Sequence, residues 1–502
     1  MITLSAQKST INRNQIAECN INGSLESIVQ HINVLGFRNF HEQEITGISC
    51  DSRDIKEGNI FAAVPGVNVD GSMFAAIAVS SGAVAVICEK PLDLPEDVTQ
   101  IIARDVRKAL AQAANAYYCY PSTKIDIIGV TGTTGKTTTA YMISHILNYN
   151  SKKTDMFTTI KNSFAGKTIA AKQTTPDAVA LTRMIHESVQ AGSKHISMEV
   201  SSHSLCQKRV AKTRFHCGVF TNLASDHLDY HVTHEAYRDA KAILFQNLNH
   251  NAWAVLNSQD KASEYFIRRT NARIIRYSSK KHASVWGRIE STSIDGIVFY
   301  VHAFGAVAII KLPIIGLHNV DNALAAIAAC LTCGLSLQQI SEAFSCFGGV
   351  PGRLQQIETR RDFSVFVDYA HTEGALATVL ANVRPFTKGR LIVVFGCGGD
   401  RDKTKRPMMA IAAEKNADLC IVTSDNPRTE NPETIISDII KGFSNKDKYL
   451  VESNRKKAIS LSLSLAKKGD VIIIAGKGHE SYQIFSDRTE HFDDCEIVRE
   501  LL

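Results

Sequence analysis

A short hydrophobic segment, followed by a glycine–threonine loop and an apolar helical pattern, constrains the fold of this chain more than any other feature. Residues 125–130 (IDIIGV) have the β-branched content of a buried strand. The loop at residues 131–138 (TGTTGKTT) follows directly, and the next residues place Ile143, Ile146 and Leu147 on one helical face. A strand that leads through such a loop into a helix predicts a phosphate-binding loop in a parallel α/β sheet.

The residue types in this loop suit the chemistry of a phosphate. Gly132 and Gly135 allow backbone N–H groups to approach phosphate oxygens, and Lys136 supplies positive charge for the terminal phosphates. The Thr137 hydroxyl is a ligand type that Mg²⁺ accepts. The strict GxxxxGK[ST] pattern is not met, because Gly129 lies one residue too far upstream. An ordinary glycine–threonine turn is the alternative, and the flanking strand and helix argue against it.

Length and composition favour three globular domains. The chain has 502 residues, with 44% hydrophobic and 21% charged residues, which excludes a mainly disordered or fibrous protein. We expect a small α/β domain at residues 1–121, a central domain with a parallel sheet at residues 122–350, and a Rossmann-like doubly wound domain at residues 351–502. The first ~20 residues are polar and are expected to be poorly ordered.

The charge and the cysteines limit the kinds of partner and the cellular compartment that we expect. The formal net charge of +6 is too small to indicate a nucleic-acid or membrane partner. A secretory signal and long apolar runs are not recognisable, so we expect a cytoplasmic protein, and we expect it to be a monomer. The 12 cysteines are expected to be reduced. Cys330 and Cys333 lie in an apolar helix predicted to start with Asp321 as N-cap and to end at Gly334, which favours core thiols over redox or metal chemistry.

A carboxylate and several histidines follow later strands. Glu199 stands near the end of a strand, where residues of a parallel sheet meet ligands. His227, His231 and His234 are close enough in sequence to suggest zinc. A phosphate loop calls instead for Mg²⁺, which prefers oxygen ligands, so we favour Mg²⁺ over a zinc hydrolase.

Lys241 occupies an unexpected position. On the helix predicted from about His234 to Asn247 it lies on the same face as Tyr237, Leu244 and Phe245. A buried ammonium would be unfavourable there. Either the stem snorkels to solvent or the lysine is functional and chemically modified, and the spacing alone does not decide between these alternatives.

Taken in order, these segments resemble the Mur ligases, the ATP-dependent amino-acid-adding enzymes of peptidoglycan precursor synthesis. The resemblance covers the chain from about residue 46 to its C-terminus. One departure is Glu373-Gly374, where the family usually has Pro-Asp. The matching segments are residues 131–138, 198–203, 226–231, 237–241, 316–326, 351–353, 368–372, 396–403 and 475–480.

The resemblance implies domains that bind a UDP-substrate, ATP and an amino acid, in that order. It also implies that ATP converts a substrate carboxylate to an acyl phosphate, which the incoming amine attacks. Lys136, Glu199, His227 and Lys241 would be catalytic, with Mg²⁺ held by Thr137, Glu199, His227 and Lys241 as a carbamate. ATP would contact Gly132, Thr133, Thr134, Gly135, Lys136, Thr137, Thr138, Asn319, Arg353 and Asp368.

The remaining motifs imply the other two substrates. Residues 424–428 (SDNPR) resemble the signature of members that add meso-2,6-diaminopimelate, although the tetrapeptide alone could be a simple turn. Diaminopimelate has a carboxylate that lysine lacks, which suits planar arginine donors. The implied amino-acid site is Arg401, Asp425, Asn426, Arg428, Gly476 and Glu480, with Glu480 facing the distal ammonium. The implied UDP-muramoyl-dipeptide contacts are Ser52, Thr174, Thr175, Ser201 and Arg209.

Three alternatives remain open at this point. Two are ligases with the same ATPase core, namely a lysine-adding Mur ligase and a folylpolyglutamate synthetase. The third is a nucleotide-dependent switch without ligase chemistry, which would leave Lys241 and the arginines of the third domain without a role.

Overall fold

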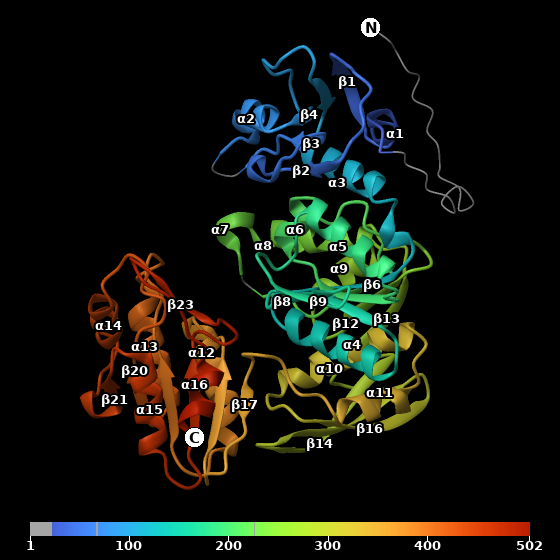
Figure 1. Ribbon diagram of the computed structural model, residues 1–502. Coiled ribbons are helices and arrows are strands. Elements are labelled where there is room, and N and C mark those ends of the chain that lie inside the picture. Colours follow the sequence, from blue (N-terminus) through green and yellow to red (C-terminus); the bar gives the residue numbers. More distant parts are fainter. Residues whose placement is uncertain (1–22, 67–68, 225) are drawn as a thin grey trace.

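The computed structural model describes residues 23–66, 69–224 and 226–502, so the expected disorder of the first ~20 residues concerns a segment outside the described part. Within that part the chain forms sheets of five, 11 and six strands in chain order, and a separate two-stranded hairpin. Figure 1 shows the first and third sheets in bodies adjoining the central one. The predicted α/β class is confirmed.

The first sheet is mostly parallel, with strand order β1-β5-β4-β3-β2 and only β1 antiparallel to its neighbour. The helix α3 begins after the N-cap Asp105 and packs an alanine-rich face on this sheet. The same core includes Ala178 of the central body, so the two bodies share a packed interface. The elements are α1 (Leu25–Val29), β1 (Val34–Arg38), β2 (Gly47–Ser49), β3 (Asn59–Ala62), α2 (Ala75–Ser80), β4 (Ala83–Cys88), β5 (Thr99–Ala103) and α3 (Val106–Tyr117).

The central sheet is parallel in its middle, as predicted, but it differs from the predicted parallel sheet at both ends. Strands β7, β10, β6, β11, β12, β13 and the start of β14 are parallel neighbours. Both ends of the sheet continue as antiparallel hairpins, β7-β8-β9 and β14-β15-β16, which the expectation of an all-parallel sheet did not include. Antiparallel edges need only short turns, so no helical crossover marks them in the sequence. The strands are β6 (Asp126–Thr131), β7 (Thr154–Phe157), β8 (Lys161–Phe164), β9 (Lys167–Ala170), β10 (His195–Glu199), β11 (Cys217–Phe220), β12 (Trp253–Asn257), β13 (Arg273–Ser278), β14 (Val285–Ser293), β15 (Gly296–Ala303) and β16 (Ala306–Leu312).

Helices cover both faces of this central sheet. Alternation along β6 sends Ile128 and Val130 to the layer of α4, α10 and α11, and Ile127 to the layer of α5, α6, α8 and α9. The two apolar layers hold the strand ends rigidly, so the loops that follow them are well positioned. The helices are α4 (Lys136–Tyr149), α5 (Ala178–Gln190), α6 (Ser202–Cys206), α7 (Leu228–His231), α8 (His234–Gln246), α9 (Ala262–Ile267), α10 (His318–Thr332) and α11 (Leu337–Phe344).

The helix α10 corrects one expectation. It begins at His318 with Leu317 at the N-cap, so Asp321 lies inside its first turn and is not the cap. The predicted end is confirmed, because Cys333 is the C-cap and Gly334 follows with φ +78°. Cys330 is buried in the core, and Cys333 is half-buried, both as free thiols. The interpretation as packing cysteines is therefore confirmed.

The third sheet is doubly wound, with strand order β17-β18-β22-β19-β20-β21, and all neighbours except β17 and β18 are parallel. Helices α12, α13 and α14 cover one face, and α15 and α16 cover the other. The elements are β17 (Gln355–Ile357), β18 (Ser364–Asp368), α12 (Glu373–Val383), β19 (Leu391–Phe395), α13 (Lys405–Asn416), β20 (Leu419–Val422), α14 (Pro432–Ile440), β21 (Tyr449–Val451), α15 (Arg455–Leu465), β22 (Val471–Ala475), β23 (Tyr482–Ile484), β24 (Thr489–His491) and α16 (Asp494–Leu501).

Candidate active site

The glycine–threonine loop joins the end of β6 to the start of α4. Gly132 has φ +154° and Gly135 φ +81°, and a Cβ at either would lie 1.9 Å from Thr221 Oγ1 or 2.3 Å from Asn322 Oδ1. Both positions therefore need glycine, for close approach as well as for backbone conformation. Lys136 Nζ donates to the carbonyl oxygens of Gly132 and Thr133 at 3.0 and 2.8 Å, which keeps the ammonium over the loop.

Two adjacent threonines of the loop, Thr133 and Thr134, are held by the segment after β11. The backbone N–H and hydroxyl of Thr134 both reach Asn222 Oδ1, at 3.0 and 3.1 Å. The hydroxyl of Thr133 accepts a hydrogen bond from the backbone N–H of Ala224 at 2.9 Å. Thr138 lies half-buried in the first turn of α4. Sequence reasoning missed Asn222, although its place just after a parallel strand was a usable signal.

Asn319 meets the same loop indirectly. Its side chain is buried, donates to Ile315 O at 2.7 Å and accepts from Asn322 Nδ2 at 3.0 Å. Since Asn322 lies directly over Gly135, the two asparagines of α10 connect that helix to the loop.

Glu199 lies at the centre of the site. It ends β10, which runs parallel to β6 with Glu199 opposite Val130, so its carboxylate reaches the start of α4. Its Oε1 accepts from the Thr137 hydroxyl and from the backbone N–H of Thr159, both at 2.9 Å. The side chain is buried. A buried carboxylate beside a threonine hydroxyl is a donor set of hard oxygens, which fits Mg²⁺.

His227 stands apart from that pair. It is exposed, has φ +54°, and its Nε2 lies 3.5 Å from Asp226 Oδ2. Its ring meets the ring of His203 at 4.9 Å between centroids. Across the described ranges, three or more His, Cys, Asp or Glu side chains are nowhere arranged to hold a metal ion. A closed four-ligand zinc site is therefore not formed by these side chains.

Lys241 is fully buried on α8, with 1% of its surface exposed. Its Nζ donates to Gly132 O at 2.8 Å and lies 4.2 Å from the centre of the Tyr237 ring. The snorkelling alternative is therefore wrong, because the amine points into the phosphate loop. Burial first, and then the neighbouring Lys136 ammonium, hold the pKa of Lys241 well below its ordinary value. The pocket therefore favours the neutral amine more than water does.

Four of the five predicted substrate residues gather beside Glu199. The buried Thr175 hydroxyl donates to Glu199 O at 2.9 Å and accepts from the Ser201 backbone N–H at 3.1 Å. Arg209 Nη1 donates to Thr175 O at 3.0 Å, and the Thr174 hydroxyl accepts from Thr159 at 3.1 Å. The fifth, Ser52, is half-buried in a short 3-10 turn (Ser52–Asp54) of the first body.

Arg353 and Asp368 lie where the central and third bodies join. Arg353 stacks its guanidinium carbon 4.9 Å from the centre of the Tyr369 ring. Asp368, at the end of β18, accepts from the backbone N–H groups of Leu354 and Ala370 at 2.7 and 2.8 Å. Burial raises the pKa of this carboxyl. Asp368 therefore anchors the linker to the third sheet, whatever else it binds.

The linker contains a second close contact. Gly352 has φ +66°, and a Cβ there would lie 2.3 Å from both Gly478 C and His479 N. The backbone of the linker is thus pressed against residues 475–480. Glu373, the departure from the usual family residue, begins α12 after the N-cap Thr372. A carboxylate is favourable in a first helical turn, so the change does not disturb this helix.

The predicted amino-acid residues surround the carboxyl ends of β20 and β22. Asn426 Nδ2 donates to Glu480 Oε2 at 2.9 Å, which joins the two motifs. Asp425 is buried, and a Cβ on Gly476 would lie 2.6 Å from its Oδ2. With φ +115°, Gly476 therefore has no room for a side chain. The expectation that residues 424–428 form only a turn does not account for this packing.

Two arginines flank the glycine-rich segment after β19. The half-buried Arg428 has φ +52°, and its Nη1 donates to Gly399 O at 2.7 Å. Arg401 is exposed, and a Cβ on Gly398 would lie 2.9 Å from Arg428 Nη1 and 3.9 Å from Arg401 Cγ, so both side chains approach this glycine. Arg428 retains further N–H donors in its guanidinium plane, so the pair can receive an anionic group.

Sequence reasoning missed a buried lysine in this region. Lys477 is fully buried, with Nζ 3.4 Å from Asn426 Oδ1 and 3.6 Å from Glu480 Oε2. It also donates to the backbone oxygen of Tyr482. Burial lowers the pKa of Lys477, while the nearby Asp425 and Glu480 raise it. Its place between Gly476 and Glu480 in the sequence was the available signal.

Known proteins match the chain over nearly its whole length. Family models described as the Mur ligase family catalytic domain, the Mur ligase middle domain and the Mur ligase glutamate ligase domain match residues 44–118, 130–330 and 352–478. A protein of Clostridium tetani named UDP-N-acetylmuramoyl-L-alanyl-D-glutamate--2,6-diaminopimelate ligase is 41% identical over 466 residues, 92% of this chain and 95% of the relative. This chain belongs to the Mur ligase family.

Two further comparisons extend this result. A Mur ligase of Gloeobacter violaceus with the same name is 42% identical over 472 residues, 93% of this chain and 96% of the relative. A solved structure of a ligase of that name has 34% identity and a TM-score of 0.68, and covers 91% of this chain and 95% of its own. None of the helices in residues 23–66, 69–224 and 226–502 of this Mur ligase is both long and apolar enough to cross a membrane.

Proposed function

We propose that this Mur ligase is an ADP-forming ligase that adds meso-2,6-diaminopimelate to UDP-N-acetylmuramoyl-L-alanyl-D-glutamate, using ATP. The observation that carries the proposal is the joined pair of motifs at residues 424–428 and 475–480, in a chain about 41% identical to ligases so named. In this proposal the partners are small-molecule substrates, and the enzyme works as a monomer in the cytoplasm. Each of the three bodies would bind one substrate. Residues 1–121 would bind the UDP-substrate, residues 122–350 would bind ATP, and residues 351–502 would bind the amino acid.

The reaction needs a charged carboxylate to become a good electrophile. In the proposed sequence, the substrate carboxylate oxygen attacks the γ-phosphorus of ATP, and ADP leaves. The amine then attacks the acyl carbon, and phosphate leaves from the tetrahedral intermediate. Lys136 and the backbone N–H groups of residues 132–138 would hold the phosphates. Thr174, Thr175, Ser201 and Arg209 would orient the dipeptide beside them.

The oxygen donors around Glu199 fit a metal ion. Thr137 and Glu199 would hold Mg²⁺, which neutralises charge on the phosphates when bound. His227 would be a further ligand or would orient one. Asn319, Arg353 and Asp368 would contact the nucleotide, Asp368 at its ribose.

Lys241 would act as a carbamate. The nitrogen of the neutral amine bonds to the carbon of CO₂ and one proton is released from that nitrogen, which converts a buried neutral group into an anion. The depressed pKa supports this step, because only the neutral amine reacts with CO₂. The carbamate would then face Lys136 and the metal from the apolar side of α8.

The amino-acid site would select by charge. Arg401 and Arg428 would receive the distal carboxylate of diaminopimelate, and Glu480 and Asn426 its distal ammonium and adjoining polar groups, with Asp425 and the Gly476 backbone beside them. Lysine has no distal carboxylate, so it would leave the arginines unpaired. A site built for a polar group rejects a ligand that lacks it. A folylpolyglutamate synthetase or a simple nucleotide switch would have no use for this arrangement.

The decisive assay is phosphate release from ATP with the UDP-dipeptide substrate and either meso-2,6-diaminopimelate or L-lysine. We expect at least about 100-fold higher kcat/KM with diaminopimelate, because a charge-assisted pair contributes this much discrimination. Equal or better turnover with lysine would overturn the proposed specificity. Release that requires no amino acid would instead indicate an ATPase or a switch.

Arg428→Ala tests the carboxylate contact. We expect the KM for diaminopimelate to rise roughly 10- to 100-fold, from loss of a bidentate donor, while the KM for ATP changes less than about twofold. Arg428→Lys is the matched control, because lysine keeps the positive charge but lacks the planar guanidinium. Its KM for diaminopimelate should therefore lie between those of wild type and Arg428→Ala. Parallel increases in both KM values would count against the assignment.

A further inference from the structure

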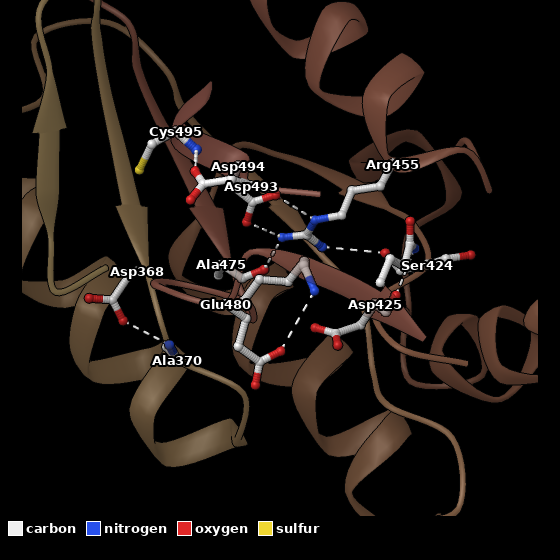
Figure 2. Close-up of polar contacts among 12 residues, drawn as sticks. Asp368, Ala370, Ser424, Asp425, Arg455, Ala475, Glu480, Asp493, Asp494 and Cys495 are labelled. Carbon is white, nitrogen blue, oxygen red and sulfur yellow. Dashed lines mark hydrogen bonds and ion pairs between the residues drawn. The ribbon is translucent and has the colours of Figure 1, made fainter. Parts of the chain in front are cut away.

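A fully buried ion pair lies behind the proposed amino-acid site. Arg455 and Asp494 each have 0% of their side-chain surface exposed. Arg455 Nε donates to Asp494 Oδ1 at 2.8 Å, and Nη2 donates to Asp494 Oδ2 at 2.7 Å, which is a bidentate pairing (Figure 2). Neither residue is among the groups that the proposed reaction uses, so the pair needs another explanation.

The guanidinium also reaches two backbone carbonyls. Nη2 donates to Ala475 O at 3.0 Å, and Nη1 approaches Ser424 O at 3.4 Å (Figure 2). These carbonyls immediately precede Asp425 and Gly476. Ser424 follows β20 and Ala475 ends β22, and the sheet order places β19 between those strands. Sheet hydrogen bonds do not join β20 to β22 directly, whereas Arg455 connects their ends.

Local helix stability does not explain the position of Arg455. It is the first residue of α15, where the positive end of the helix dipole disfavours a cation. The helix has its own cap, since the Asn454 side chain accepts from the Lys457 N–H at 3.0 Å. Asp494 is the first residue of α16, so two helix starts bring these charges together. The pair is thus placed by the fold where it contacts the two strand ends.

The ends of these two strands are packed closely against each other, at Asp425 and Gly476. The β-position of Gly476 is 2.6 Å from Asp425 Oδ2, so a shift of either strand end alters the surface formed by Asp425 and Gly476. We propose that Arg455, neutralised by Asp494, is a positioning residue that sets the spacing of Asp425 and Gly476 and so determines amino-acid binding. This inference rests on the proposed function, because it concerns the same amino-acid site.

The test must separate positioning from simple stability. Removing one member of a buried pair leaves an uncompensated charge, whereas replacing both by apolar residues is often tolerated. We would therefore compare wild type with Arg455→Met/Asp494→Leu and with Arg455→Lys. Arg390→Met is the control, because Arg390 pairs with Asp470 at 2.8 Å at the opposite end of this sheet, where β19 and β22 begin.

For Arg455→Met/Asp494→Leu we expect a KM for diaminopimelate at least tenfold higher than wild type. The KM values for ATP and the UDP-dipeptide should change less than twofold, and Arg455→Lys should show a smaller rise. Arg390→Met should leave all three KM values unchanged. Should the double variant fail to fold, the selective rise in Arg455→Lys is the measurement that decides.

Unchanged diaminopimelate binding in the folded double variant would overturn the inference. So would equal increases in all three KM values, since these would show a general structural role. Absence of diaminopimelate turnover in wild type would instead overturn the proposed function, which keeps the two failures distinct.

Discussion

Lys241→Ala is expected to lose nearly all ligase activity, with kcat reduced roughly 1,000-fold, the effect of removing one well-placed charged group from a buried reaction centre. The buried amine donates to Gly132 O in the phosphate loop, and α8 contains no other lysine that could form a carbamate there. Phosphate release under saturating substrates measures the effect. Partial recovery on adding formate or acetate is expected, because a small carboxylate can occupy the vacated anionic position.

The control is Lys241→Met, which fills the space without a titratable group. In CO₂-free buffer the unfolded wild-type chain keeps this lysine protonated up to about pH 10.5, while the folded chain does not, because burial lowers its pKa. The unfolded state then binds more protons, so wild-type stability should rise with pH between the lowered pKa and 10.5. Lys241→Met should lack this rise in Tm. Full activity in either variant would exclude the carbamate role.

Glu199→Gln is expected to lower kcat roughly 100- to 1,000-fold and to raise the Mg²⁺ concentration needed for half-maximal activity. The substitution keeps the size of the side chain but removes the charge. Its amide oxygen can still accept from the Thr137 hydroxyl and the Thr159 N–H, which share Oε1, but its NH₂ group cannot accept from the Thr159 hydroxyl, which now lies 3.3 Å from Oε2. Initial rates across a Mg²⁺ titration measure both effects.

Thr137→Ser and Thr137→Val form a matched pair for this prediction. Serine keeps the hydroxyl and should retain most activity, whereas valine has the same shape without it and should follow Glu199→Gln. A Mg²⁺ dependence identical to wild type in Glu199→Gln would contradict the assignment of this carboxylate.

Much of the fold was predictable because its strands are short, buried and β-branched. The segments at β19, β20 and β22 are apolar over their full length, and the helix around Lys241 was located to within one residue. The placement of Glu199 at the ligand-binding edge of the sheet was also predicted, and the structure shows why it meets Thr137, since the ends of β6 and β10 share that edge. These are local patterns that a single sequence contains.

Other features depend on long-range contacts that local patterns do not encode. Asp321 resembles an N-cap, yet the N-cap of α10 is Leu317, four residues earlier. Arg455 looks like an ordinary surface arginine at a helix start, and only the arrival of Asp494 from α16 buries it. The sequence alone could not decide whether Lys241 is buried or snorkels to solvent, because its hydrogen-bond partner Gly132 lies 109 residues away in the chain.

The contact of Gly352 with Gly478 and His479 has a consequence for protein engineering. The segment that leads into the third body is seated on that body's own amino-acid motif, with no space for even a methyl group. The linker around Gly352 and the third body are therefore packed together and should be treated as one unit. Chimeras that exchange amino-acid specificity between Mur ligases should carry this segment with the incoming module, with the junction placed upstream of Val350.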